Sequence, residues 1–558
     1  MPAEGATSIA AAALGRKRRL HPLAIFNPFG GYSRPPRLGW RLPNFKAVAL
    51  AVLVGVVLYL DAASDSVTVT DDGGILLQRT ELTWVDGLVL VTVIGIVAAC
   101  IARWWSFQWW IENDAIRTSG GIVHRWKRTT TFDRIVTVDH TSTPLQRIFR
   151  VSRIAMETTA MHQAEPDILL GYLTRRDARL LEHLLVTRLV FDGDEGAAWE
   201  FDPRGLGHLG WRELIVAGAT TIQISRALVT LWAASQLAAY IAIPSPTLAF
   251  DTETGAYGLT PLQFAIVAIA GIVAVVWLTS TVYFIASFAR FRLGRHEGWL
   301  TVDTGVIRPV RRLIRIDAIQ GLEVSRSPLQ RQFRGKRAML RMRMPAYGAP
   351  PNYAMVLHPA VTDAAIPGLT EHIMGMDAAS SRAMCGQGIH RLDASSRLAY
   401  MTFWPRRIAA AAAAVLLLLL VVQPELWWWA LIPLALTVPL AGMGLLAWRS
   451  AGWHADNGDW LVLQRGALGL TSTAARVDRI QYLAWSLPLL SRPPASASMA
   501  VSVATSGGAG LISRILAALH RPVDPSIVRL RAVGAADARE IALASGTEPA
   551  LPPALAAE

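Results

Sequence analysis

The sequence of 558 residues is poor in charge and in cysteine. Only 17% of its residues are charged, whereas 52% are hydrophobic. This balance favours an integral membrane protein over a soluble one. The two cysteines, Cys100 and Cys385, are too few for a disulfide framework and lack the spacing of metal ligands. A disulfide-stapled domain and a zinc site are therefore excluded.

Signatures of catalysis and of nucleotide binding are also lacking. The histidines are scattered, without an HExxH motif or a His/Cys cluster, and His183 lies beside Glu182, where a solvated helix face is the ordinary interpretation. The glycine-rich stretch 506–510 lacks the Lys-Ser/Thr that would complete a phosphate loop, so a flexible hairpin is favoured. We expect no enzyme activity, no metal and no cofactor.

The net charge of +13 could indicate either nucleic acid or a membrane as the partner. Lysine and arginine gather beside apolar segments and within a repeated motif, which is where membrane proteins keep their cytoplasmic charge. We therefore expect no nucleic acid partner. Residues 1–44, which include the basic run 16–19, are predicted to be a poorly ordered cytoplasmic tail.

Six apolar segments occur in three pairs, and each is near the length that crosses a bilayer. The loops within the first two pairs are acidic, whereas arginines flank the pairs, so both termini are predicted to be cytoplasmic. A shorter apolar segment, 214–224, is predicted to lie at the interface. Few ionisable residues lie within the spans, which argues against a transport pathway. The predicted spans are 45–60, 84–105, 227–243, 262–288, 408–422 and 426–448.

A motif of 27 residues after each pair is the element that the chain repeats. It runs from Gly121 to Arg147 and from Gly305 to Arg331, and a weaker third copy begins at Gly466. Repeated spacing indicates a repeated structural unit. The matched residues are Gly121, Asp133, Pro144 and Gln146 in the first copy, Gly305, Asp317, Pro328 and Gln330 in the second, and Gly466, Asp478 and Pro488 in the third, where the proline comes one residue early.

Each copy is predicted to form a hairpin at the glycine and then an apolar strand that is broken at the aspartate. The Asp133 and Asp317 carboxylates are expected to accept backbone hydrogen bonds at that break. After the first copy, residues 174–189 carry leucines at helical spacing, which predicts an amphipathic helix.

The glycine hairpin, the Asp-x-Ile step and the Ser/Thr-Pro-Leu-Gln-Arg step resemble the YdbT-like bacterial membrane proteins, which carry repeated pleckstrin-homology-like (PH-like) domains. The resemblance covers residues 45–545 and is weakest in the third copy. It implies a C-terminal helix in each β-rich domain, a bacterial inner membrane location, and a smaller one-domain membrane protein as partner.

The predicted fold class is an α+β membrane protein with six transmembrane helices in three pairs, each pair followed by a cytoplasmic PH-like domain. The expected boundaries are a tail at 1–44, transmembrane pairs at 45–105, 214–289 (with the interfacial segment) and 406–448, PH-like domains at 106–190, 290–375 and 449–545, linkers at 191–213 and 376–405, and a final tail at 546–558.

Basic residues within the repeats are the remaining functional signal. They lie close to a membrane whose inner face is anionic, so they are candidates for contact with the lipid bilayer, with anionic headgroups or with an acidic partner; simple positive-inside charge is the alternative. We expect a non-catalytic membrane scaffold, and the alternative is a subunit of an export or resistance system. The candidate surface comprises Arg125, Lys127, Arg128, Arg134, Arg308, Arg311, Arg312 and Arg315.

Overall fold

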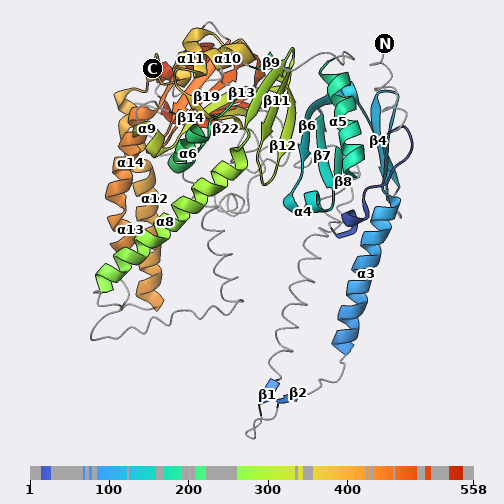
Figure 1. Cartoon of the computed structure of the whole chain (residues 1–558). Coiled ribbons are helices and arrows are strands. Elements are labelled where there is room, and N and C mark those ends of the chain that lie inside the picture. The colour runs from blue at the N-terminus through green and yellow to red at the C-terminus, as the bar shows by residue number, and fades with distance from the viewer. Residues whose placement is uncertain are drawn as a thin grey trace. The chain divides into compact units, whose positions relative to one another are not determined.

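The computed structural model of the chain divides into two compact units (Figure 1). The first comprises residues 1–160 and 166–198, and the second comprises residues 161–165 and 199–558. The structure describes residues 14–26, 67–69, 75–77, 84–121, 125–158, 168–191, 200–201, 208–221, 261–332, 337–343, 356–422, 425, 431–456, 459–486, 497–503, 527–533 and 535–544. The predicted spans 45–60 and 227–243 lie outside these residues, as do residues 426–430 at the start of the last predicted span.

The first unit contains a long apolar helix followed by a β-rich module, residues 107–190. Helix α3 (Trp84–Ser106) leads into the antiparallel strands β3 (Gln108–Glu112), β4 (Ala115–Gly120) and β5 (Trp126–Thr131). A second antiparallel sheet contains β6 (Ile135–Thr141), β7 (Val151–Thr158) and β8 (Ile168–Thr174). Helix α5 (Arg175–Leu189) closes the module. A small hairpin, β1 (Val67–Val69) with β2 (Ile75–Leu77), precedes α3.

The core of the first module lies between its two sheets and α5. Trp109, Ile116, Ile135 and Met156 are fully buried, and α5 adds Leu181 from the apolar face that the leucine spacing predicts. The side chain of Thr174 caps α5 by accepting a hydrogen bond from the backbone N–H of Asp177. The helix therefore begins where the eighth strand ends.

The N-terminal basic segment is packed against this module, which corrects the expectation of a poorly ordered tail for residues 14–26. Leu14 and Leu20 are buried. The backbone of Arg18 exchanges two hydrogen bonds of 2.9 Å with that of Trp109, and its guanidinium pairs with Asp177. The 3-10 helix η1 (Pro22–Phe26) follows. Two apolar anchors and one ion pair thus hold a segment whose composition alone indicated a loose tail.

The β-structure of the second unit begins with four neighbouring antiparallel strands. They are β9 (Glu200–Phe201), β10 (Arg292–His296), β11 (Trp299–Thr304) and β12 (Val310–Arg315), in spatial order β9-β10-β11-β12. A one-turn 3-10 helix, η4 (Ile316–Ala318), then breaks the chain before the next strand. The strand break that the sequence predicts at Asp317 is therefore present.

The next sheet is shared by the second module (residues 291–375) and the third module (residues 452–544). β13 (Gly321–Arg326), β14 (Arg337–Arg343) and β15 (Val356–Thr362) come from the second module. β17 (Gly452–Asp456), β18 (Trp460–Arg465) and β19 (Leu470–Arg476) come from the third, and β16 (His390–Arg391) pairs with β17. β13 pairs antiparallel with β19 from Gly321 opposite Ala475 to Arg326 opposite Leu470. Backbone pairing therefore joins the two modules.

The third module is completed by a separate three-stranded sheet and a helix. The sheet consists of β20 (Ile480–Ser486), β21 (Ala497–Val503) and β22 (Ile527–Val533), and α16 (Ala535–Ala544) follows. Leu461 and Leu463 of β18 share a buried cluster with Val501 and Leu530 of this sheet and Ile541 of α16. Helix α10 (Ile366–Met374) is the corresponding helix after β15.

The segment 376–405, predicted to be a linker, is folded. Helix α11 (Ala378–Met384) contacts β17, β18 and β19, and Ser380, Ser381 and Ala383 are fully buried. Its serines and alanines, which indicated a linker by composition, allow close packing on the sheet. The expected linker 191–213 likewise contains strand β9. The sequence did not predict this strand, because two residues are too few to show a strand pattern.

Long apolar helices precede the second and third modules. α6 (Trp211–Thr220) packs with α8 (Pro261–Phe288) and with β15, and Leu214 shares a buried cluster with Phe284 and Val356. α12 (Arg397–Val422) packs with α14 (Thr437–Ser450), and α13 (Leu431–Ala435) lies between them in sequence. Within the described residues, Ala270–Phe288 is the one stretch long and apolar enough to cross a membrane.

Candidate membrane-facing surface

In all three repeats the turn at the motif glycine is hydrogen-bonded to the end of the helix that leads into the module. The Gly121 N–H donates to Ser106 Oγ (3.3 Å), the Gly305 N–H donates to the Ala289 carbonyl (2.9 Å), and Ser450 Oγ donates to the Gly466 carbonyl. All three glycines have positive φ, and at Gly305 (φ 88°) a side chain would also meet the Arg308 carbonyl. The turn is therefore fixed at the helix end.

The second of these turns presents apolar side chains at that end. Val306 and Ile307 are 40% and 55% exposed, Arg308 beside them is exposed, and the Val306 N–H donates to the Ala286 carbonyl of α8 (3.2 Å). Leu468 has the corresponding place in the third turn and is 52% exposed. Apolar residues at the end of an apolar helix suit a membrane interface better than water.

The Pro-Leu-Gln-Arg step forms a one-turn helix in each of the first two copies: α4 (Pro144–Ile148) and α9 (Pro328–Gln332). Both glutamines close a capping box. Gln146 Oε1 accepts from the Thr143 N–H (3.0 Å), while the Gln146 N–H donates to Thr143 Oγ1 (3.3 Å). Gln330 and Ser327 exchange the same two bonds at 2.8 and 3.2 Å. The prolines sit at the first helical positions, where no donor is needed.

The repeated aspartates lie in matched 3-10 turns: η2 (Phe132–Arg134), η4 and η7 (Val477–Arg479). The carboxylate of Asp317 accepts from Arg315 Nε (2.7 Å), and that of Asp478 accepts from Arg476 (3.1 and 3.0 Å). For these two, the bonds are to an arginine side chain instead of the backbone. Hydrogen bonding by the Thr131 side chain, aided by the charge of Arg134 and by backbone N–H groups, holds the pKa of Asp133 below its usual value.

The eight candidate basic residues differ in how their charge is balanced. Arg311 forms a bidentate pair with Asp303 (2.9 and 3.1 Å), and Arg315 pairs with Asp317. In the first module Lys127 lies over the Trp110 ring, 5.3 Å from its centroid. Among the described residues no ion pair involves Arg125, which is exposed. The remaining candidates, all at least partly exposed, are Arg128, Arg134, Arg308 and Arg312.

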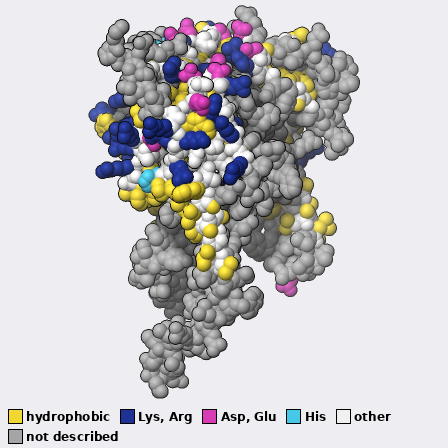
Figure 2. Space-filling view, turned by 90° about the vertical axis from the view of Figure 1, so that its right-hand side faces the viewer, with side chains coloured by type: hydrophobic (Ala, Val, Ile, Leu, Met, Phe, Trp, Pro, Cys, Tyr) yellow, Lys and Arg dark blue, Asp and Glu magenta, His cyan; other side chains and the backbone are white. Residues whose placement is uncertain are grey.

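Residues of the N-terminal segment extend this basic surface. The Lys17 ammonium lies 5.4 Å from the Trp110 centroid, and the Arg19 guanidinium lies 4.0 Å from that of Trp105 at the end of α3. Figure 2 shows Lys and Arg side chains clustered directly above a band of hydrophobic side chains. That order, basic above apolar, is typical of the cytoplasmic interface of a membrane protein.

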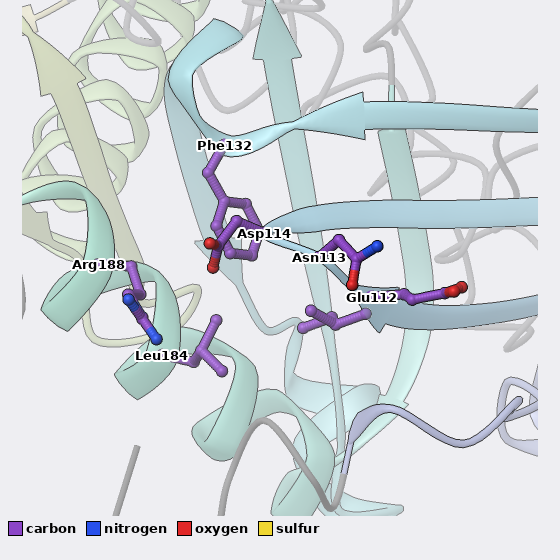
Figure 3. A pocket seen from close by; sticks show the side chains of 7 residues that line it. Glu112, Asn113, Asp114, Phe132, Leu184 and Arg188 are labelled. Atoms are coloured by element: carbon purple, nitrogen blue, oxygen red, sulfur yellow. The ribbon is translucent and has the colours of Figure 1, made fainter. Parts of the chain in front are cut away.

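A small hollow in the first module lies away from this surface. It has a volume of about 210 Å³ and lies beside the β3–β4 turn, where Asp114 faces Arg188 and Leu184 of α5 (Figure 3). Because β3 starts at the end of α3, this turn is one strand length, about 17 Å, from the helix end. The hollow is smaller than typical ligand clefts, and we assign it no ligand.

The described residues contain no cluster of three or more His, Cys, Asp or Glu side chains that could hold a metal ion. Burial, with the nearby Asp363 carboxylate, raises the pKa of the Cys385 thiol to about 11. A thiol with so high a pKa stays protonated at neutral pH and is a poor nucleophile. Pro488, the third-copy proline, lies outside the described residues.

Repeated antiparallel β-modules, each mounted on an apolar helix, define a membrane-associated protein with PH-like domains. Residues 47–187, 249–342 and 404–545 match the family model described as Bacterial PH domain, and the chain belongs to that family. It is 24% identical over 254 residues to the UPF0699 transmembrane protein YdbT of Bacillus subtilis (strain 168). That match covers 44% of this chain and about half (51%) of the relative. No solved structure matches.

Proposed function

We propose that the chain is a non-catalytic membrane scaffold that presents three PH-like modules at the cytoplasmic face of the bacterial inner membrane. The observation that carries the proposal is the attachment of all three glycine turns to the ends of α3, α8 and α14. Hydrogen bonding to a helix end fixes each module close to the point where that helix leaves the bilayer. A module so placed is positioned to contact headgroups and any protein bound there.

The proposal includes six spans in three pairs with both termini inside. Two observations support lipid around the described helices. Large apolar side chains of α3 such as Val91 and Ile94 are 67% and 58% exposed, and Val267 and Val273 of α8 are 59% and 60% exposed. Helices with outward-facing apolar side chains are stable in a bilayer, because their backbone groups are satisfied internally.

We further propose that the basic residues of the first two modules hold them against anionic headgroups. Each lysine or arginine near an anionic surface contributes about 1 kcal/mol. Arg125, Lys127 and Arg308 support this most directly, because Arg311 and Arg315 are paired with aspartates. A smaller one-module membrane protein as partner rests on the family resemblance alone, and co-isolation followed by mass spectrometry tests it.

Reporter fusions in the full chain test the arrangement. Fusions at Asp71, Asp251 and Glu425 are expected to report the outside, and fusions at Thr130, Gly321 and the C-terminus the inside. A fusion within any module that reports the outside would contradict the proposal, because the three modules would then no longer share one compartment.

A further inference from the structure

Helix α4 exposes a cluster of apolar side chains that the fold of the first module does not use. Leu145 is 65% exposed, Ile148 is 74% exposed and Phe149 is 47% exposed, and no residue of α4 is buried. Single exposed apolar residues are common on soluble surfaces, but three within five residues form a patch. An exposed apolar patch of this kind is typical of a site that contacts a membrane or another protein.

The cluster is held rigidly in its exposed position. The capping box of Thr143 and Gln146 fixes the start of the turn, and Gln146 Nε2 donates to the Gly171 carbonyl of β8 (3.2 Å). After the turn, Arg150 adopts positive φ (55°), and its carbonyl accepts from the Arg175 N–H (3.0 Å). The apolar side chains therefore cannot fold back without loss of these bonds.

A path of hydrogen bonds places α4 at the same end of the module as the end of α3. Trp104 Nε1 of α3 donates to the Leu20 carbonyl (2.9 Å), and the N–H of the next residue, His21, donates to the Tyr172 carbonyl (2.8 Å). Tyr172 adjoins Gly171, which binds Gln146 of α4. Figure 1 shows α4 at this end of the module.

The basic residues around α4 indicate that the apolar patch contacts lipid and not protein. Arg147 and Arg150 are exposed beside the apolar cluster, and Arg19 lies over Trp105 at the end of α3. Apolar side chains rimmed by arginine, at the level of an interfacial tryptophan, match the boundary between acyl chains and anionic headgroups. An apolar protein groove would not require the arginines.

We propose that Leu145, Ile148 and Phe149 of α4 insert into the cytoplasmic leaflet and that Arg147 and Arg150 contact its anionic headgroups. The proposal rests on the proposed function, since it requires the first module to be cytoplasmic. It adds a specific depth to that arrangement: α4 reaches the acyl boundary, whereas the basic residues of the module stay at the headgroup level and its far end lies in water.

The test uses the full chain in lipid nanodiscs that contain anionic lipid, in a background with Cys100→Ala and Cys385→Ala. An environment-sensitive fluorophore is attached at Ile148→Cys. Arg188→Cys, exposed on α5 beside the β3–β4 turn at the far end of the same module, is the matched control. Lipids with a nitroxide high on the acyl chain are expected to quench the label at position 148 roughly threefold or more above the control, since interfacial side chains lie 5–10 Å deep.

Equal, water-like emission and equal quenching at the two positions would overturn the proposal. So would a label at position 148 that is shielded from a water-soluble quencher but unaffected by the lipid nitroxide, because the occupant would then be protein. Reporter fusions that place the module inside, together with either result, would leave the scaffold proposal intact and remove the insertion alone.

Discussion

The short helices α4 and α9 arise from the same motif and have opposite surroundings. Both are closed by a capping box between a hydroxyl residue and a glutamine. In α4, Leu145 is 65% exposed. In α9, Leu329 is half-buried, and Arg331 donates to the carbonyls of Ala467 (2.8 Å) and Leu468 (3.1 Å) in the third module. The motif thus encodes a turn, while the surroundings decide whether that turn is covered by protein.

The basic strands β5 of the first module and β12 of the second differ in a similar way, because only β12 has a neighbouring acid. Asp303 lies opposite Arg311 across β11 and β12 and neutralises it. At the matched positions of the first module, Ser119 lies opposite Lys127, so the cross-strand acid is missing. The second module directs its repeat inward to protein contacts, whereas charged and apolar side chains of the repeat are exposed in the first module.

The largest effect is expected where the second module meets the third. A Cβ at Gly321 would lie 2.3 Å from the Ala474 carbonyl of β19, so Gly321→Ala should force β13 and β19 apart. We expect a loss of roughly 3 kcal/mol in unfolding free energy, as for severe overpacking. Thermal unfolding of the detergent-solubilised chain measures it, and hydrogen exchange at residues 328–332 should rise towards that of α4.

Gly298→Ala is the matched control, because nothing lies within 4 Å of a Cβ at that turn. If both substitutions shift unfolding equally, or if neither does, the shared sheet does not carry the coupling between the two modules. The difference between α4 and α9 would then need another cause.

Replacing the capping glutamines of α4 and α9 should give a smaller difference in unfolding free energy. Gln330 is 3% exposed and also donates to Thr221 Oγ1 (3.0 Å), so Gln330→Ala removes a cap and takes a hydrogen-bond donor from the half-buried Thr221 hydroxyl. We expect a loss of about 2 kcal/mol for Gln330→Ala and about 1 kcal/mol for Gln146→Ala. Chemical denaturation of both variants measures the two losses, and a larger loss for Gln146→Ala would contradict the contrast in burial.

The sequence alone predicts the local structure of these repeats well and their surroundings poorly. Glycine turns, the break at Asp317 and the amphipathic α5 follow from spacing and side-chain type, which act within a few residues. The pairing of β13 with β19 depends on residues about 150 positions apart, and the sequence of neither strand indicates which strand it pairs with. Burial of Leu14 and Leu20, and the exposure of Ile148, depend on tertiary contacts in the same way.

The charge contrast predicts unequal lipid binding. Arg125→Gln with Lys127→Gln removes charges that no acid neutralises within the described residues, at about 1 kcal/mol each near an anionic surface. Arg311→Gln with Arg315→Gln removes charges already paired with Asp303 and Asp317. Native mass spectrometry of the chain released from mixed-lipid nanodiscs should show fewer retained anionic lipids for the first pair. Equal loss from the two pairs would mean that ion pairing does not decide the contact.

The smallest expected effects are at the repeated aspartates. Asp317 is 59% exposed in its pair with Arg315, and exposed pairs contribute little, so Asp317→Ala should cost about 0.5 kcal/mol or less and the cost should shrink with salt. A loss above 1 kcal/mol at high salt would show that the carboxylate does more at the strand break than pair with Arg315.

Asp133 offers a pH-dependent test that sharpens the comparison. Its pKa in the folded chain is below the ordinary 3.8 because the Thr131 side chain, Arg134 and backbone N–H groups favour the carboxylate. A group with a lowered folded pKa binds fewer protons when folded, so its stabilising contribution is present above pH 3.8 and is lost as pH falls through the folded pKa. Asp133→Asn should therefore have a lower unfolding free energy than the parent chain at neutral pH, and the two free energies should converge in acid below pH 3.8.

Unfolding curves of parent and variant between pH 7 and pH 3 measure this convergence. A difference that stays constant across that range would mean that Asp133 acts through its shape in the 3-10 turn and not through its charge.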